Sequence, residues 1–357
     1  MKLLNAFFAT ALVGALSLPA LAQEKLKIGF VYPSPIADVG WSAELNAGRL
    51  AIEEHFGDQV ETIFVENVPE GPDAARIMNQ MAAQGANMIM LGSFGYMNDG
   101  IKLAQQRPDM TFIHASGFKI EPNFGNFQSR NYESSYLVGM AAGDVTESDV
   151  IGIVAAYAIP EVVGMINGFT LGVQKTNPDV TVKVVWLNSW FDPPKAQDSA
   201  RALIAQQADV IYSLYQDTPS VVTVAEEEGV WVINTSSDMK EYAPTWLLAS
   251  QVADWSNYFI ESAQATIDGT FEGTPYWGGM ADGAVDVKSW ADAISDETMA
   301  MIEEAATAMR AGELHPITGP IVDQEGTEIL ADGVAIMDAD LLGINWLVSG
   351  VETRLPN

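Results

Sequence analysis

Short apolar runs alternate with longer segments of helical period along almost the whole chain after Gln23. The runs are rich in β-branched and aromatic residues, which predicts buried strands. These strands are predicted at Lys27–Tyr32, Thr62–Glu66, Met88–Leu91, Thr111–Ala115, Asn123–Ser129, Val150–Val154, Thr181–Leu187, Val210–Tyr215, Val230–Thr235 and Trp246–Ser250. Helices are predicted at Ala43–His55, Pro72–Gln84, Met97–Gln106, Ser134–Glu147, Glu161–Thr176, Pro194–Gln206, Pro219–Glu228 and Trp255–Asp268. This alternation is typical of an α/β protein with doubly wound parallel sheets.

The same order of elements occurs twice. It starts at Lys27 and again at Val150, and two halves of about 120 residues fit two lobes better than one oversized sheet. We expect the boundary near Thr146–Asp149 and a late segment that returns to the first lobe. The first lobe is thus expected at 23–146 plus about 247–282, and the second at 147–246 plus about 283–357.

The N-terminus has the pattern of a signal peptide. Lys2 precedes a mostly apolar stretch from Leu3 to Leu18, and Ala20-Leu21-Ala22 has the small residues of a cleavage site. The alternative, a membrane helix, is disfavoured because the apolar stretch is short of the ~20 residues that a span needs. We expect 1–22 to be removed. No cysteine follows that could carry a lipid, so we expect an exported, soluble periplasmic protein.

Composition removes several classes of function. The chain has no cysteine, which excludes disulfides, thiol catalysis and Cys-ligated metal sites. Its net charge of −30 repels nucleic acid and anionic lipid, so neither is an expected partner. The acidic surface alone does not indicate a cationic ligand.

Polar and aromatic side chains gather where predicted strands end. Such ends form the ligand-binding edge of open α/β sheets. In the first half they are Asp38, Trp41, Ser93, Phe94 and Tyr96, and in the second half they are Trp190, Asp217 and Asp238. If both halves direct these ends at one cleft, aromatic faces and carboxylates would suit a flat, nitrogen-rich heterocycle.

Each candidate also has a structural interpretation. Asp38 and Asp192 can cap the helices that follow them, and for Asp192, before two prolines, capping is the favoured role. Asp217 and Asp238 can act in the same way. Trp41 and Trp190 lie in loops and fit either ligand stacking or packing between lobes.

Catalytic motifs are absent from the sequence. His55, His114 and His315 are far apart and form no His-Glu-x-x-His helix, and packing is the favoured role for His114. Neither a Gly-x-Ser-x-Gly elbow nor a phosphate loop occurs. We therefore expect a ligand carrier without cofactor or metal rather than an enzyme. A secreted nucleoside hydrolase is the alternative from a different class.

Three segments resemble the basic membrane protein (BMP) family of ABC-transporter substrate-binding proteins. They are Ile28-Gly29-Phe30-Val31 with Asp38-Val39-Gly40-Trp41, Arg130 to Gly139, and Asn188-Ser189-Trp190-Phe191-Asp192-Pro193-Pro194-Lys195-Ala196. The resemblance implies a type I periplasmic-binding-protein fold with two hinged lobes. It also implies a purine nucleoside or related ligand and an ABC permease in the inner membrane as partner. We expect a monomer.

The resemblance also assigns site residues. It places the two ring-stacking aromatics at Trp41 and Trp190, and an acid of nucleoside-binding members at Asp238. Two positions depart from the family pattern, because Ser116 stands where many members have Asp and Ala253 replaces a lysine that touches the sugar. These departures favour a free base such as adenine. A nucleoside or a riboflavin-like ligand remains the alternative.

Overall fold

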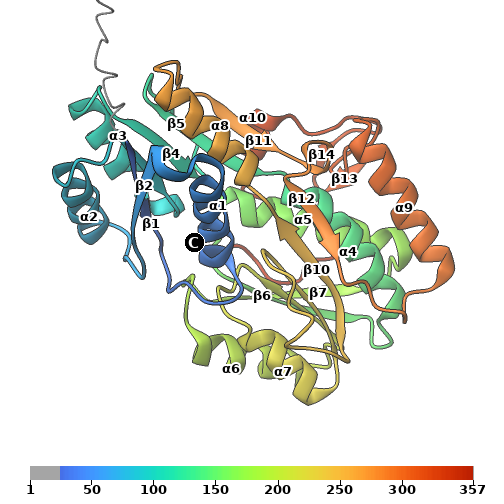
Figure 1. Cartoon of the computed structure of the whole chain (residues 1–357). Coiled ribbons are helices and arrows are strands. Elements are labelled where there is room, and N and C mark those ends of the chain that lie inside the picture. Colours follow the sequence, from blue (N-terminus) through green and yellow to red (C-terminus); the bar gives the residue numbers. More distant parts are fainter. Residues whose placement is uncertain (1–24, 357) are drawn as a thin grey trace, which may run out of the picture.

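Two six-stranded sheets form the cores of two lobes (Figure 1). The computed structural model describes residues 25–356, so the expected signal peptide at 1–22 lies outside the described residues. The first sheet has the order β11-β5-β4-β3-β1-β2, and the second has the order β12-β10-β9-β8-β6-β7. Every pairing in these two sheets is parallel except that of β12 with β10. The predicted α/β class with two parallel-sheet lobes is confirmed.

The strands lie close to their predicted positions. The first sheet contains β1 (Leu26–Val31), β2 (Val60–Val65), β3 (Met88–Leu91), β4 (Thr111–Ala115), β5 (Phe124–Ser129) and β11 (Pro275–Gly278). The second contains β6 (Val150–Ala155), β7 (Thr181–Trp186), β8 (Val210–Leu214), β9 (Trp231–Asn234), β10 (Leu247–Ala253) and β12 (Val285–Lys288). A small antiparallel pair, β13 (Ile321–Val322) and β14 (Glu328–Leu330), lies near the C-terminus.

Helices cover both sheets. They are α1 (Trp41–Phe56), α2 (Pro72–Ala83), α3 (Met97–Gln106), α4 (Asn131–Val145), α5 (Pro160–Thr176), α6 (Pro193–Ile204), α7 (Ser220–Glu228), α8 (Ser256–Ile267), α9 (Asp296–Arg310) and α10 (Asp338–Leu341). No helix in the described part of the chain is both long and apolar enough to cross a membrane. Asp192 accepts a hydrogen bond from the Lys195 backbone amide at the start of α6, which confirms its predicted capping role.

Apart from β11 and β12, the two sheets have the same strand order. The first reads β5-β4-β3-β1-β2 and the second β10-β9-β8-β6-β7. The strand order reverses at β1 in the first sheet and at β6 in the second. The connections on the two sides of that strand run to opposite faces of the sheet, which leaves a crevice at the carboxyl ends of the strands. The crevice lies beside β1 and β3 in the first lobe and beside β6 and β8 in the second.

The chain crosses between the lobes three times: after β5, after β10 and between β11 and β12. Two segments expected in the first lobe belong to the second. The strand β10 pairs with β9 and β12, and helix α4 packs against α5, α9 and β10. By sheet membership and packing we assign 25–129 and 255–278 to the first lobe. Residues 130–254 and 279–356 then form the second, so the expected boundaries at 146 and 247 were wrong.

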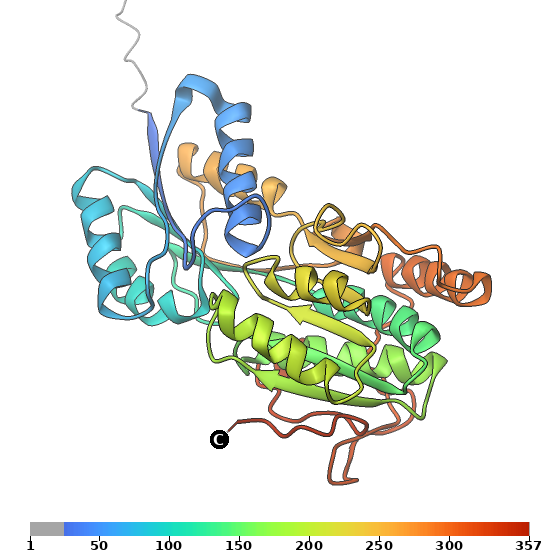
Figure 2. The ribbon, with the colours of Figure 1, turned by 90° about the horizontal axis from the view of Figure 1, so that it is seen from below.

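Close packing of α4 on α5 explains the first correction. Eleven of the fifteen residues of α4 are buried, so this helix needs apolar neighbours on nearly all sides. A Cβ at Gly139 of α4 would collide with the Phe169 carbonyl of α5, so only glycine permits this approach. Seen from below, both helices lie over the sheet of the second lobe, and the C-terminal segment runs beneath it (Figure 2). There Val351 bridges to Val182 of β7.

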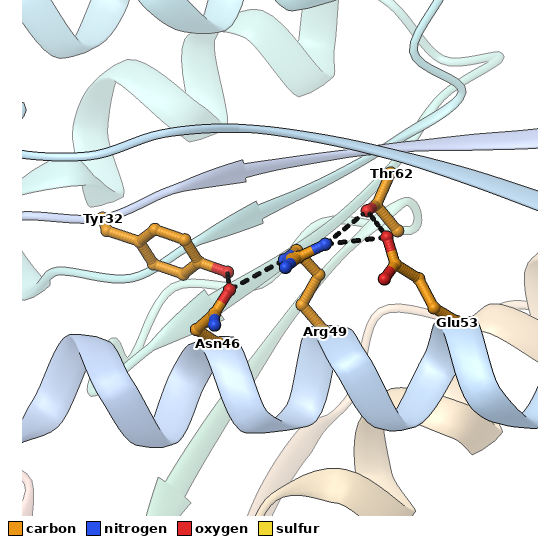
Figure 3. A network of polar contacts seen from close by, with 5 residues as sticks. All are labelled: Tyr32, Asn46, Arg49, Glu53 and Thr62. Atoms are coloured by element: carbon orange, nitrogen blue, oxygen red, sulfur yellow. Dashed lines mark hydrogen bonds and ion pairs between the residues drawn. The ribbon is translucent and has the colours of Figure 1, made fainter. Parts of the chain in front are cut away.

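A polar network holds α1 against the first sheet (Figure 3). Arg49 donates hydrogen bonds to Asn46 Oδ1 at 2.8 Å, to Glu53 Oε1 at 2.7 Å and to Thr62 Oγ1 at 2.9 Å. The Tyr32 hydroxyl, just after β1, reaches Asn46 Oδ1 at 3.5 Å. Because the Arg49 side chain is largely buried, these bonds act where water competes little. The body of α1, whose first residue is Trp41, is thereby held against β1 and β2.

Candidate functional site

A cavity lies between the lobes at the carboxyl ends of both sheets. It contains about 390 Å³ of empty space, including space open to solvent. The loops after β1, β3 and β4 supply its first-lobe side, and the segments after β6, β7 and β8 supply its second-lobe side. The lining residues are Pro33, Trp41, Gly92, Ser93, Phe94, Ser116, Ile159, Glu161, Trp190, Tyr215 and Asp217.

Aromatic side chains from both lobes wall this cavity. Trp41 donates its indole N–H to the Gly92 carbonyl at 2.7 Å, and its ring lies edge-on to Tyr215 with centroids 5.3 Å apart. Trp190 packs against Tyr157 at 4.8 Å and donates its indole N–H to Glu70 Oε1 at 3.1 Å. Glu70 belongs to the first lobe, so Trp190 also connects the lobes. Both indoles are held by hydrogen bonds that leave ring surface at the cavity.

Asp217 follows β8 in the second lobe, but its carboxylate lies against the first lobe. It accepts hydrogen bonds from the Ser34 hydroxyl and, at 3.3 Å, from the Ser42 backbone amide in the first turn of α1. Burial raises the pKa of Asp217 to about 7, although the hydrogen bonds from Ser42 and Trp41 lower it. Backbone amides at a helix N-terminus attract anions. Asp217 therefore joins the two lobes as well as lining the cavity.

The approach of Asp217 depends on Gly40, the residue before α1. Gly40 has a φ of 105°, which favours glycine, and a Cβ there would collide with Asp217 Oδ1. Its amide donates to Ser237 Oγ at 2.8 Å, and Ser237 in turn donates to Glu44 Oε1 at 2.6 Å. Two contacts from the second lobe thus meet at the start of α1.

Glu161, in the first turn of α5, presents a carboxylate from the second lobe. Its Oε1 accepts hydrogen bonds from the Tyr215 hydroxyl at 2.6 Å and the Asn131 side-chain amide at 3.4 Å. Within the described residues its Oε2 is covered and has no hydrogen-bond partner. Burial raises the pKa of Glu161, while the neighbouring Ser116, Tyr215 and Asn131 lower it. Glu161 Oε2 is therefore a hydrogen-bond acceptor without a donor among the described residues.

Unusual backbone conformations gather at the same strand ends. Ser116, Asn188, Tyr215 and Ser236 have φ values of 59°, 51°, 54° and 76°, although none is glycine. They follow β4, β7, β8 and β9, and Ser116 and Tyr215 line the cavity. Such residues cost about 1–3 kcal/mol each and cluster at binding sites, where the surrounding structure imposes them.

A second cavity adjoins the first and shares Phe94, Ser116 and Glu161 with it. It contains about 430 Å³ of empty space, again including open space, and extends toward the segments that cross between the lobes. Its other lining residues are Phe118, Gln128, Ser129, Asn131, Tyr132, Pro160, Gly164, Met165, Trp277, Leu341 and Leu342.

The structure brings together six of the nine candidate site residues: Trp41, Ser93, Phe94, Ser116, Trp190 and Asp217. The other three line neither cavity. Tyr96 is fully buried and bonds the Val68 carbonyl, whereas Asp38 is exposed and does not cap α1, whose N-cap is Gly40. Asp238 is exposed and accepts hydrogen bonds from Lys240 N and the Ser289 hydroxyl.

Five lining residues were not among the candidates. Pro33 and Gly92 belong to loops that the sequence had singled out, so proximity to their neighbours could have found them. Ile159, Glu161 and Tyr215 lie at the ends of β6 and β8, and the shared strand order was the signal that could have found them.

The histidine and acid side chains give no sign of a metal centre. His114, which we expected to pack, is fully buried and bonds the Ser93 carbonyl at 2.8 Å and Asn126 at 3.3 Å. Desolvation lowers the pKa of His114 to about 4, so the ring is neutral near pH 7. Across residues 25–356, no group of three His, Asp or Glu side chains is arranged to hold a metal ion.

Two duplicated α/β lobes with a cavity between their strand ends define a bilobed ligand-binding protein of the type I periplasmic-binding-protein class. A solute-binding protein of an ABC transporter from Aeropyrum pernix has this fold, with a TM-score of 0.73 and 17% identity over 84% of this chain and 93% of that one. The glucose-galactose binding protein GanP of Geobacillus stearothermophilus is similar too, with a TM-score of 0.58 and 13% identity over 74% and 97%.

Residues 25–311 match the family model described as ABC transporter substrate-binding protein PnrA-like, and the chain belongs to this Bmp family. It is 40% identical to a purine-binding protein of Brucella abortus over 94% of this chain and 96% of that protein. It is also 34% identical to a protein of Haloferax volcanii named as an ABC transporter glucose-binding protein, over 94% of this chain and 82% of that protein. The resemblance that the sequence motifs suggested is confirmed.

Proposed function

We propose that this substrate-binding protein carries a purine-type ligand, with a free base such as adenine favoured, to its ABC permease. The observation that carries the proposal is the cavity between the lobes, which combines indole walls with two buried carboxyl groups. Aromatic faces stack on a flat base, and each such contact is worth roughly 1–3 kcal/mol. The Brucella relative, named as purine-binding, supports the same ligand class.

Closure of the lobes would hold the ligand. Trp190 bonds Glu70, Asp217 bonds the start of α1, and Ser237 bonds Gly40 and Glu44, so each of these contacts joins one lobe to the other. A ligand that contacts both lobes stabilises this arrangement in proportion to its preference for it. The closed form would then be the one that the permease recognises.

A free base fits better than a nucleoside. Ser116 places a hydroxyl in the cavity where many family members carry Asp. Ala253, which replaces the family's sugar-contacting lysine, is buried in β10 and lines neither cavity. A nucleoside would occupy the second cavity as well, and a riboflavin-like ligand would need still more of it. These ligands remain alternatives in the same role.

Glucose is the second candidate, and the Haloferax relative favours it. Indole faces also pack against sugar rings, but a sugar offers hydroxyl groups around its whole edge, and each buried hydroxyl needs a partner. The first cavity has mainly apolar and aromatic lining, with Ser93, Ser116, Tyr215, Glu161 and Asp217 as its polar side chains. This lining favours the flat heterocycle.

Native mass spectrometry of protein purified without refolding tests the proposal, because a tightly bound ligand survives purification. We expect a bound mass of one purine. Calorimetric titration should rank adenine above guanine, adenosine, riboflavin and glucose. Tight binding of glucose without binding of any purine would contradict the proposal. Release of free base from adenosine by the purified protein would instead support the nucleoside hydrolase.

We also propose export to the periplasm, as the family role and the signal-peptide pattern at 1–22 suggest. Fractionation of cells that express the whole chain tests this step. The mature protein should appear in the periplasmic fraction, shorter by the mass of the predicted signal peptide. Full-length protein in the cytoplasm alone would contradict it.

A further inference from the structure

The carboxyl group of Glu161 is held in one orientation. Tyr215 and Asn131 both donate to Oε1, and the Tyr215 hydroxyl is itself bonded by the Asn131 amide at 2.6 Å. Burial keeps the pKa of Tyr215 well above its usual value, so the hydroxyl stays protonated and remains a donor. Rotation of the carboxyl group would break these bonds. Oε2 therefore has a fixed position.

That second oxygen accepts no hydrogen bond among the described residues, although the Ser116 hydroxyl lies close enough to the carboxyl group to lower its pKa. It is covered, while Glu161 lines both cavities. A buried acceptor left unpaired costs about 1–3 kcal/mol, and more when it is charged. Glu161 follows Pro160 at the start of α5, where the helix dipole favours the ionised carboxylate. A ligand that brings an N–H group would remove this cost.

We propose that Glu161 Oε2 accepts the ring N9–H of a free purine base and thereby selects the base over its 9-substituted derivatives. This inference rests on the proposed purine-binding function. In a nucleoside, N9 carries the sugar instead of hydrogen, so Oε2 would stay unpaired and would face a bulky group. Sites built to bond a donor discriminate strongly against analogues that lack it.

Adenine and 9-methyladenine provide the test on the wild-type protein. They share the ring and the exocyclic amine and differ at N9. By calorimetric titration we expect 9-methyladenine to bind at least 100-fold more weakly than adenine. Equal affinity for the two would overturn the proposal. Binding of neither would instead refute the proposed purine function.

Glu161→Gln tests whether this residue is the cause. Tyr215 and Asn131 require an acceptor at Oε1, so the glutamine would place its NH₂ group where Oε2 was, donor against donor with N9–H. We expect the affinity for adenine to fall at least tenfold, while the affinity for 9-methyladenine changes by less than about threefold. The preference for adenine would thereby shrink.

Glu133→Gln is the matched control. Glu133 is also a carboxyl whose pKa is raised by burial, and its Oε2 accepts a hydrogen bond from the Met280 amide, but it lines neither cavity. This variant should keep the wild-type preference. An unchanged preference in Glu161→Gln would overturn the proposal, since the discrimination would then arise elsewhere. The wild-type comparison needs no substitution and decides the case if that variant does not fold.

Discussion

Asp217 should make ligand binding weaken as the pH rises. Both of its oxygens are engaged by the first lobe, so separation of the lobes would return the carboxyl group to water and to its ordinary pKa of 3.8. With the lobes in contact, as in this structure, burial raises that pKa to about 7. At any pH between these two pKa values, closure of the lobes is therefore accompanied by protonation of Asp217. The resulting stabilisation is complete below pH 3.8 and is lost as the pH rises through about 7.

The size of the effect follows from the two pKa values. Each pH unit between them corresponds to 1.36 kcal/mol, so the upper limit is about 4 kcal/mol. Water that enters the closed site and relaxation of α1 reduce this limit, and we expect a 10- to 100-fold loss of adenine affinity between pH 5 and pH 8. At 1.4 kcal/mol per decade this loss corresponds to roughly 1.4–2.8 kcal/mol.

Asp217→Asn isolates this group from others that titrate nearby. Glu161 lines the same cavity and Glu44 contacts Ser237 between the lobes, and burial raises both pKa values, but neither residue is changed in the variant. Calorimetric titration with adenine at pH 5 should show the variant binding up to about tenfold more tightly, because part of the wild-type stabilisation is already lost above pH 3.8. Between pH 5 and pH 8 this ratio should grow by a further 10- to 100-fold, because an amide has no charge to bury. A ratio that does not change with pH would refute the reasoning.

Four further substitutions test the arrangement of the site. Trp41→Ala or Trp190→Ala should weaken purine binding by 10- to 100-fold, from the roughly 1–3 kcal/mol of base stacking, and unchanged calorimetric affinity in both would contradict the aromatic walls. Gly40→Ala should weaken binding about tenfold or more and lower the melting temperature, because its Cβ meets Asp217 and its φ is strained; equal thermal melts and affinities would count against this contact. Asp238→Asn should leave affinity within twofold, since the side chain lines neither cavity, and a large loss would restore it to the site.

Much of the fold could be predicted because its strands are continuous apolar runs. Met88–Leu91 and Thr111–Ala115 were predicted to the residue, and the other predicted strands differ from the observed ones by a few residues at most. The strands β11 and β12 have only four residues each and join the edges of sheets formed by distant segments. No local pattern identifies such a strand. The boundary expected near 247 depends on these late crossings and was misplaced for the same reason, whereas the boundary expected near 146 was misplaced because α4 packs on α5 of the second lobe.

The site was harder to predict than the fold. Trp41 and Trp190 were candidates because each lies in a loop at a strand end, where ligand stacking and packing between the lobes fitted equally well, and both line the cavity. Asp38 and Asp238 have the same kind of position, but their exposure depends on how the loops turn after the strand. The residue type of Glu161 gave no signal, because an acid in the first turn of a helix is the expected residue there, and only its position after β6 could have indicated the cavity. Its role depends on two donors distant in sequence that occupy only one of its oxygens.

The two buried carboxyl groups of the second lobe should therefore act differently. Asp217 has its partners in the first lobe, so its substitution should shift closure and change the affinity for every ligand by one common factor. Among the described residues Glu161 has hydrogen-bond partners for only one oxygen, so its substitution should change the affinities for adenine and 9-methyladenine by different factors. Titration of both ligands into both variants separates these roles. If Asp217→Asn altered the ratio of the two affinities as strongly as Glu161→Gln, closure and selection would be one event at one site, and the division argued from their hydrogen bonds would be wrong.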